Sequence, residues 1–278
     1  MKVAKSIATL RAWRKRRPGR VVLVPTMGAL HSGHAALIQC ARRLAGPGGS
    51  VVVSIFVNPI QFGPKEDFSA YPRPLKSDLT VCRNTGADSV FAPSPQEMYA
   101  RDRSISVDES LLSASLCGRS RPGHFRGVCT VVAKLFLIVQ PTHAIFGEKD
   151  WQQLAVIRRM VRDLNFPVGV VGHRTVREAD GLATSSRNVY LNPSERALAP
   201  RIHAALLAGA GKKSPAAVEA AASRLIATIP GARTDYVEAV HAETLQPLKS
   251  RKFPGRLAAA VFLGATRLID NIPLPPNP

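Results

Sequence analysis

Two histidines lie three residues apart in the segment PTMGALHSGH, residues 25–34. If this segment opens a helix, His31 and His34 project to the same side, because residues three apart share a helical face. Two imidazoles on one side can donate hydrogen bonds to oxygens that gain negative charge during a reaction. Gly28 and Gly33 let the backbone approach a phosphate closely. The pattern therefore predicts a polyphosphate-binding turn.

A histidine pair can also bind zinc or pack in a core. A spacing of three without a third ligand nearby argues against a zinc site, and the adjacent glycines argue against a core pair. No Gly-Lys-Ser/Thr follows, so the turn is not a Walker A loop. Four widely spaced cysteines contain no Cys-x-x-Cys pair, which predicts reduced, mostly buried thiols and no metal site. They are Cys40, Cys82, Cys117 and Cys129.

The turn lies between two kinds of apolar pattern. Residues 20–25 form a short β-branched run typical of a buried strand, and residues 34–44 carry apolar residues at helical spacing. A second apolar run at 51–59 completes a strand–helix–strand unit, typical of a right-handed parallel crossover. The turn is thus expected at the carboxyl end of a strand, where a helix N-terminus favours negative charge.

The alternation of strands and helices continues along the chain. It predicts an α/β fold, a Rossmann-like doubly wound parallel sheet, followed by a smaller C-terminal α+β domain. We place the boundary between residues 1–175 and 176–278. Further predicted helices cover residues 75–85, 127–139, 151–165 and 214–229, and further strands cover 89–94, 143–148 and 167–173, with short strands within 234–248 and 256–272.

Composition limits the class of protein. The 278 residues are 45% hydrophobic and 21% charged, which is ordinary for a globular chain, and no apolar run approaches the length of a membrane span. The basic N-terminus has no apolar signal region. A surface helix with Ile7, Leu10 and Trp13 on its apolar face is preferred there over an organelle transit peptide. The expected location is cytoplasmic, with no membrane partner.

The formal net charge of +19 raises the alternative of a basic nucleic-acid-binding protein. The arginines are spread along the chain, however, and the densest cluster, residues 14–20, has no interleaved aromatic residues. Aromatic residues make up only 6% of the chain, so a base-stacking surface is not indicated. We therefore expect a solvated basic surface that attracts anionic substrates, with no nucleic-acid partner.

Two later segments carry groups suited to phosphate. Lys149 follows the apolar residues 144–146 and can act on a phosphate as a point charge, although a surface pair with Glu148 or Asp150 is the alternative. Residues 185–187 supply two hydroxyls and a guanidinium, a set that matches phosphate oxygens or an ordinary surface loop.

Six segments, in order along most of the chain, resemble the pantothenate synthetase family. The His-x-Gly-His turn is similar to that of nucleotidyltransferases, which cut ATP between its α- and β-phosphates. The resemblance implies an AMP-forming ligase that condenses pantoate with β-alanine through pantoyl adenylate, using ATP and Mg²⁺ and releasing pyrophosphate. The six segments are PTMGALHSGH, SIFVNPIQF (54–62), SRPGHFRGV (120–128), IFGEKDWQQL (145–154), READGLATSSRN (177–188) and RLIDN (267–271).

The resemblance also implies the site residues. His34 is the implied proton donor, Gln61 and Gln153 hold pantoate, and Gln61 with Asn58 contacts β-alanine. No protein metal ligand is assigned. The implied ATP-binding residues are Met27, Gly28, Ala29, Leu30, His31, Ser32, Gly33, His34, Gly147, Glu148, Lys149, Asp150, Val176, Thr184, Ser185, Ser186 and Arg187.

The same resemblance assigns nucleotide and pantoate binding to residues 1–175 and a Ser-Ser-Arg lid loop, with Gly181 as its hinge, to residues 176–278. It also implies a homodimer. The sequence departs from the family at Thr184, where Met or Leu is usual. A different nucleotidyltransferase, which transfers a nucleotide to a phosphorylated acceptor, is the alternative within the same chemistry.

Overall fold

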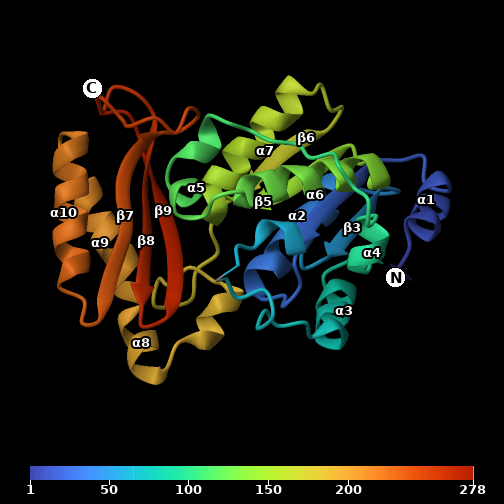
Figure 1. The fold of residues 1–278 in the computed structure, drawn as a ribbon, viewed down its shortest axis with the longest axis horizontal. Coiled ribbons are helices and arrows are strands. Elements are labelled where there is room, and N and C mark those ends of the chain that lie inside the picture. The colour runs from blue at the N-terminus through green and yellow to red at the C-terminus, as the bar shows by residue number, and fades with distance from the viewer. Residues whose placement is uncertain (65, 278) are drawn as a thin grey trace. The chain divides into compact units, whose positions relative to one another are not determined.

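The computed structural model describes residues 1–64 and 66–277. Internal contacts divide the chain into two compact units (Figure 1). The last change of unit follows Arg174, but two earlier segments also group with the second unit. The first unit holds Met1–Glu109, Arg121–Glu148 and Val156–Arg174, and the second holds Ser110–Ser120, Lys149–Ala155 and Thr175–Pro278.

The first unit is built on six parallel strands. They are β1 (Lys2–Ala4), β2 (Val21–Thr26), β3 (Ser50–Ile55), β4 (Ser89–Phe91), β5 (His143–Gly147) and β6 (Gly169–His173). Their order in the sheet is β1-β4-β3-β2-β5-β6, so the chain winds outward in both directions from β2. This order confirms the predicted doubly wound α/β fold.

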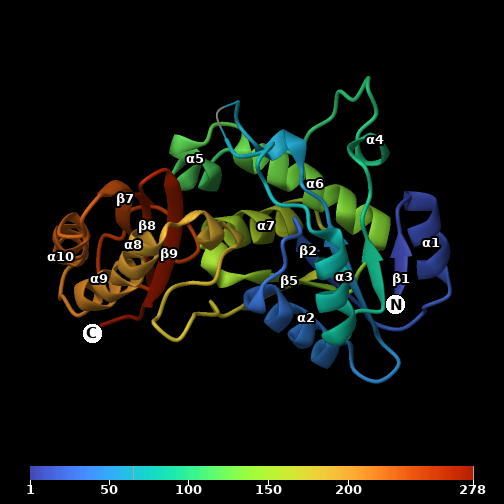
Figure 2. The same cartoon turned by 90° about the horizontal axis from the view of Figure 1, so that it is seen from below.

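Helices cover both faces of this sheet. Those that the first unit contributes entirely are α1 (Ile7–Lys15), α2 (Ser32–Ala45), α3 (Leu75–Asn84), α4 (Pro95–Met98), α6 (His124–Val139) and the 3₁₀ turn η1 (Pro59–Gln61). Leu37 and Ile38 of α2 and Cys82 of α3 share one core with Val51 and Val53 of β3. On the other face α6 packs against β2 and α1 (Figure 2).

The second unit contains a three-stranded antiparallel sheet, β7-β8-β9, with helices against it. Ile202 and Leu206 of one helix and Ile226 of the next share a core with Leu257 of the central strand. The elements of this sheet and its helices are β7 (Ala232–His241), β8 (Gly255–Leu263), β9 (Thr266–Leu274), α8 (Pro193–Leu198), α9 (Pro200–Ala210) and α10 (Pro215–Ala227). The remaining elements are α5 (Cys117–Ser120), α7 (Trp151–Asp163), η2 (Leu112–Ala114), η3 (Glu148–Asp150) and η4 (Ser186–Tyr190).

The structure corrects several predicted elements. The short strands expected near the C-terminus are nine or ten residues long, because β8 and β9 continue through a tight turn at Gly264, whose φ is +54°. Strand β3 ends at Ile55 rather than at residue 59. Strand β1, which pairs with β4 at the sheet edge, was not predicted, because three residues carry too little periodicity to recognise.

Candidate active site

The predicted phosphate-binding turn starts where β2 ends. The hydroxyl of Thr26 donates to the carbonyl of Ser54 (2.7 Å) and accepts from the backbone N–H of Gly28 (3.2 Å). Gly28 has a φ of +87°, and a Cβ there would lie 3.0 Å from a carboxylate oxygen of Asp78. Only glycine therefore fits this position without strain.

Asp78 of α3 holds the middle of the turn. Its two carboxylate oxygens accept the backbone N–H groups of Ala29 (3.0 Å) and Leu30 (2.8 Å), and the residue is 1% exposed. Burial raises the pKa of Asp78, although the two amides partly oppose this effect. Asp78 was not among the residues predicted from the sequence. The sequence did contain a signal for it: an acidic residue four positions before Cys82, on the buried face of a predicted helix, needs a polar partner there.

His31 and His34 form a capping box at the start of α2. The Nδ1 atom of His31 accepts from the backbone N–H of Gly33 (3.2 Å), and the Nδ1 atom of His34 accepts from the backbone N–H of His31 (3.4 Å). The helix consequently begins at Ser32, whereas the sequence predicted a turn up to residue 33. Since each Nδ1 atom accepts, each neutral ring carries its proton on Nε2 and is a donor there.

The two rings lie close together, with centroids 4.1 Å apart and planes inclined by 42°. The structure therefore places two imidazole N–H donors together at the N-terminus of a fourteen-residue helix. That terminus follows a central strand of the sheet. This arrangement suits an anion whose charge grows during reaction.

Asn58 and Gln61 lie on and beside η1, just after β3. Both are buried, and their side chains are joined by a hydrogen bond of 3.0 Å between Asn58 Nδ2 and Gln61 Oε1. Gln61 Nε2 lies 3.0 Å from the sulfur of Met27, at the start of the predicted phosphate-binding turn. The fold thus brings together a predicted pantoate-binding residue and a predicted ATP-binding residue.

Gly147 ends β5 in the first unit, and Glu148 follows it. A Cβ at Gly147 would meet no atom within 4 Å, so the backbone faces open space there. Strand β5 is the neighbour of β2 in the sheet, and the two pair at Val22–His143 and Leu23–Ala144. The carboxyl ends of two adjacent central strands therefore carry predicted ATP-binding residues, as expected at a doubly wound switch point.

The second unit contains Lys149, Asp150 and Gln153. Lys149 Nζ lies 3.9 Å from a carboxylate oxygen of Asp150, which is a long ion pair, and its carbonyl accepts from Asn271 Nδ2 (2.9 Å). Gln153 is half-buried. Its neighbour Gln152 instead uses its whole amide within the protein, to residues 112, 115 and 117, and is structural.

Val176 and Thr184 are brought together by a short antiparallel turn. The carbonyl of Val176 accepts both the backbone N–H (3.0 Å) and the hydroxyl (2.8 Å) of Thr184. Gly181, predicted as a hinge, has a φ of +93° in this turn. Ser185 then caps η4 by accepting the backbone N–H of Arg187 (3.3 Å).

A buried ion pair holds the base of this turn. Both guanidinium ends of Arg177 donate to the carboxylate of Asp270 (2.7 and 2.9 Å), and His203 Nδ1 lies 3.4 Å from the same carboxylate. Burial opposes ionisation of Asp270, but the neighbouring His203 and the hydrogen-bonded guanidinium of Arg177 outweigh it and hold the pKa of Asp270 below its usual range. Arg177 and Asp270 both lie in segments that carry the family resemblance, but their pairing was not predicted from the sequence.

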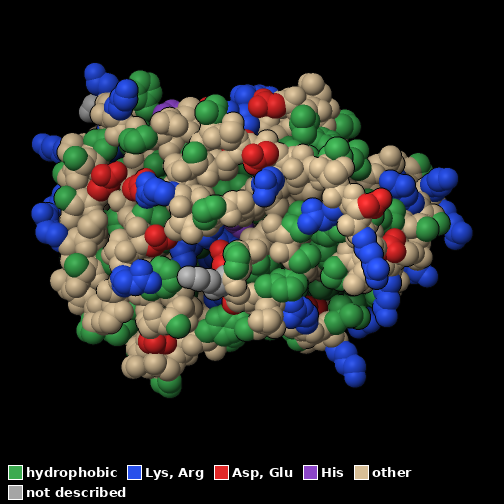
Figure 3. Space-filling model, in the orientation of Figure 1, with side chains coloured by type: hydrophobic (Ala, Val, Ile, Leu, Met, Phe, Trp, Pro, Cys, Tyr) green, Lys and Arg blue, Asp and Glu red, His purple; other side chains and the backbone are tan. Residues whose placement is uncertain are grey.

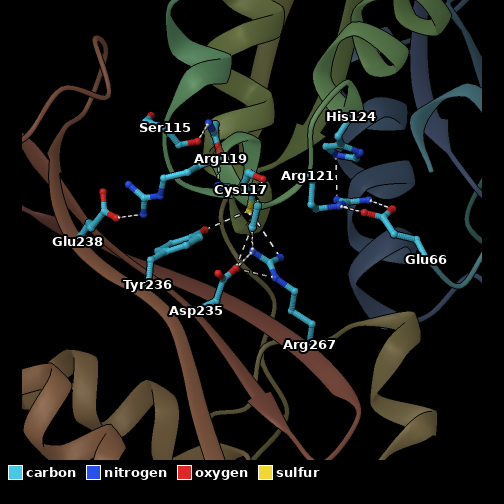
Figure 4. A network of polar contacts seen from close by, with 12 residues as sticks. Glu66, Ser115, Cys117, Arg119, Arg121, His124, Asp235, Tyr236, Glu238 and Arg267 are labelled. Carbon is cyan, nitrogen blue, oxygen red and sulfur yellow. Dashed lines mark hydrogen bonds and ion pairs between the residues drawn. The ribbon is translucent and has the colours of Figure 1, made fainter. Parts of the chain in front are cut away.

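The cysteines are accounted for by burial and by local contacts, and the positive charge is spread over the surface seen in Figure 3. In the described residues all four cysteines are free, and burial raises the pKa of the Cys82 and Cys129 thiols to about 12. Cys117 contacts the Tyr236 hydroxyl at 3.1 Å and the Arg267 guanidinium (Figure 4). Lys and Arg side chains are scattered over the face shown in Figure 3.

Two kinds of feature are absent from residues 1–64 and 66–277. That part of the chain contains no group of three or more His, Cys, Asp or Glu side chains placed to hold a metal ion. None of its helices combines the length and hydropathy needed to cross a bilayer.

Comparison with known proteins gives a consistent result. A family model described as pantoate-beta-alanine ligase matches residues 2–273. The pantothenate synthetase of Akkermansia muciniphila is 56% identical over 93% of this chain and 94% of its own, and that of Moorella thermoacetica is 50% identical over the full length of both.

Two solved structures have the same fold. The pantothenate synthetase of Thermus thermophilus is 48% identical with a TM-score of 0.93, covering 99% of this chain and 100% of that one. The pantoate-beta-alanine ligase of Francisella tularensis, solved in complex with beta-gamma ATP and beta-alanine, is 32% identical with a TM-score of 0.82, covering 98% and 97%. This chain belongs to the pantoate-beta-alanine ligase family.

Proposed function

We propose that this chain condenses pantoate with β-alanine in two steps driven by ATP. In the first, a carboxylate oxygen of pantoate attacks the α-phosphorus of ATP, and pyrophosphate leaves as pantoyl adenylate forms. In the second, the amine of β-alanine attacks the acyl carbon, giving pantothenate and AMP. Family membership supports this reaction, and the ligands of the Francisella relative support ATP and β-alanine as substrates.

The single structural observation that carries the proposal is the histidine pair at the start of α2. His31 and His34 each have Nδ1 occupied by a backbone N–H, so both can donate from Nε2. The oxygen between the α- and β-phosphorus atoms gains charge as pyrophosphate leaves, and two N–H donors stabilise that charge. We assign His34 as the residue that donates a proton or hydrogen bond to the leaving group.

The residues proposed to bind ATP are assigned unit by unit. In the first unit these are residues 27–34 with Gly147 and Glu148. In the second unit Lys149 supplies a positive charge, Asp150 accepts from the nucleoside, and Val176 with residues 184–187 forms the lid loop. We propose that the first unit is the nucleotide- and pantoate-binding domain and the second unit carries the lid.

Glutamine side chains suit the proposed acid substrate. Pantoate carries hydroxyls and a carboxylate, and a glutamine amide offers both a donor and an acceptor. We propose that Gln61 and Gln153 bind pantoate, and that Gln61 and Asn58 belong to the β-alanine site, Gln61 by direct contact and Asn58 by holding Gln61. The mixed anhydride is already activated, so the protein mainly orients the amine and excludes water in the second step.

Mg²⁺ is proposed to bind together with ATP and to neutralise part of the phosphate charge. In nucleotide sites this ion is commonly held by one or two carboxylates plus the phosphates. That arrangement needs no cluster of three protein ligands, and residues 1–64 and 66–277 present none. A homodimer is proposed from the family resemblance, and light scattering after gel filtration tests it. A cytoplasmic location is proposed from the composition of the chain.

The deciding experiment is ATP–pyrophosphate exchange that depends on pantoate and Mg²⁺, followed by measurement of AMP after β-alanine is added. We expect exchange without β-alanine and one AMP for each pantothenate. Exchange with other acids but not with pantoate contradicts the substrate assignment. Nucleotide transfer to a phosphorylated acceptor without AMP release contradicts the ligase reaction.

A further inference from the structure

Three hydrogen-bonded polar side chains in the first unit form a series, Tyr99–Asn58–Gln61, which we call the relay. The hydroxyl of Tyr99 donates to Asn58 Oδ1 (2.8 Å), and Asn58 is 1% exposed. Asn58 Nδ2 donates to the carbonyl oxygen of Gly127 and to Gln61 Oε1, each at 3.0 Å. Both hydrogens and the oxygen of the Asn58 amide are therefore engaged within the protein.

The donors and acceptors of these hydrogen bonds can be assigned in only one way. A backbone carbonyl can only accept, so the nitrogen of the Asn58 amide must face Gly127. The same nitrogen then makes Gln61 present its oxygen to Asn58, which turns the Gln61 N–H groups the other way. They face the thioether of Met27 at 3.0 Å, and a thioether is a weak acceptor. An incoming anionic oxygen is a stronger acceptor for these N–H groups.

The backbone of Gln61 is fixed separately by the first turns of α6. His124 Nδ1 donates to the carbonyl oxygen of Gln61 (2.8 Å), and a Cβ at Gly127 would lie 2.6 Å from Gln61 Cα. Arg121 donates to His124 Nε2 (3.0 Å) and to both oxygens of Glu66 (2.7 Å each) (Figure 4). Only the orientation of the Gln61 amide therefore depends on Asn58 and Tyr99.

Tyr99 is well placed to remain a donor. Burial raises the pKa of its hydroxyl far above its usual value, so the hydroxyl keeps its proton at neutral pH. Its ring packs at 6.1 Å from that of Phe56, and the cations of Arg103 and Lys134 lie 5.3 and 5.8 Å from its centroid. These ring contacts keep the hydroxyl directed at Asn58 without a contribution from substrate.

We propose that Tyr99 and Asn58 are positioning residues that orient the Gln61 amide, so that its N–H groups face an oxygen of the acid substrate. The identity of that acid as pantoate rests on the proposed function. The reversed amide would direct the Gln61 carbonyl oxygen at a carboxylate or hydroxyl oxygen and repel it. The relay therefore selects for an acceptor at this position of the site.

A double-mutant cycle tests the relay. Tyr99→Phe removes one hydroxyl and keeps the ring, and we expect it to raise KM for pantoate about fivefold, with KM for ATP unchanged, because one neutral hydrogen bond is lost. In a Gln61→Ala background, where no amide remains to be oriented, Tyr99→Phe should change KM for pantoate by less than about 1.5-fold. Equal effects in both backgrounds, or no effect alone, overturn the relay.

Two further measurements distinguish a misoriented Gln61 amide from a general loss of packing. Tyr236→Phe, which removes the hydroxyl that contacts Cys117 in the second unit, should leave KM for pantoate within about twofold. The Gln61 side-chain amide signal in a ¹⁵N NMR spectrum, assigned by its loss in Gln61→Ala, should shift in ligand-free Tyr99→Phe, and an unmoved signal contradicts the relay. Absence of pantoate-dependent exchange in the wild-type protein instead contradicts the proposed function.

Discussion

The two segments proposed to contact the phosphates of ATP are held in different ways. In the first unit, the turn at residues 26–34 is held along its length by Asp78, which accepts two of its amides, and by the capping pair His31 and His34. In the second unit, the lid loop at residues 184–187 has local contacts, from Thr184 to Val176 and from Arg187 to Ser185.

The two segments also differ in how exposed their neighbouring residues are to solvent. Val189 and Tyr190, which follow it in η4, are 74% and 38% exposed, whereas Asp78 beside the turn is 1% exposed. A segment held by a distant, buried side chain opens only when that packing is broken, whereas an exposed segment held by local hydrogen bonds opens at lower free energy. We therefore expect the proposed phosphate turn to be preformed and the proposed lid to open more readily.

The largest expected effect separates catalysis from capping at His34. His34→Ala should lower kcat by a factor of about 10²–10³, because an N–H donor to the leaving phosphate is lost. His34→Glu is the matched variant, since a glutamate at this helix position can still complete the capping box but has no N–H to donate. We expect normal thermal stability but a kcat at least as low in the glutamate variant. Full turnover in His34→Glu would mean that the imidazole acts only as a cap.

The buried Arg177–Asp270 ion pair, at the base of the turn that precedes the lid loop, should give the largest loss of stability when it is broken. Asp270→Asn should lower the free energy of unfolding by about 3 kcal/mol, since it leaves Arg177 and His203 without their buried carboxylate. The wild-type contribution is complete above about pH 5 and is lost as the pH falls, because the pKa of Asp270 is lower in the folded state. Urea unfolding between pH 3 and 7 measures both effects.

Asp163→Asn is the control for that measurement, because the Arg162–Asp163 pair is more than half exposed on both sides. It should change the free energy of unfolding by less than about 0.5 kcal/mol throughout the same pH range. A pH dependence that remains the same in Asp270→Asn would show that other carboxylates cause it.

The support of the phosphate turn should give an intermediate effect. Asp78→Asn offers one acceptor where Ala29 and Leu30 need two, so we expect KM for ATP to rise about tenfold and stability to fall by about 1–3 kcal/mol. Thr80→Ala, on the exposed side of the same helix, should change neither quantity measurably. Normal ATP kinetics in Asp78→Asn would show that the turn keeps its shape without this carboxylate.

The smallest effect is expected at the base of the lid. Thr184→Val keeps the side-chain shape and the backbone bond to Val176 and removes only the hydroxyl bond. The free energy of unfolding should fall by no more than about 1 kcal/mol, and KM for ATP should change less than threefold. A loss as large as that of Asp78→Asn would remove the difference between the two segments.

Local sequence patterns predicted much of the first unit and of its proposed phosphate turn. Alternating apolar runs and helical spacing predicted the strands and helices around residues 20–60, because buried strands and amphipathic helices leave distinct periods in the chain. The glycine at position 28 and the histidines at 31 and 34 predicted the phosphate turn. The family resemblance predicted the reaction that the matches to pantoate-beta-alanine ligases support.

The partners that hold those residues were decided by tertiary structure. Asp78 lies 48 and 49 residues from the amides that it accepts, Tyr99 lies 41 residues from Asn58, and Arg177 lies 93 residues from Asp270. No local period relates groups so far apart, since their contact depends on which strands and helices become neighbours. The sequence by itself determined which groups can do the chemistry, and the packing of the chain decided which buried polar groups fix them in place.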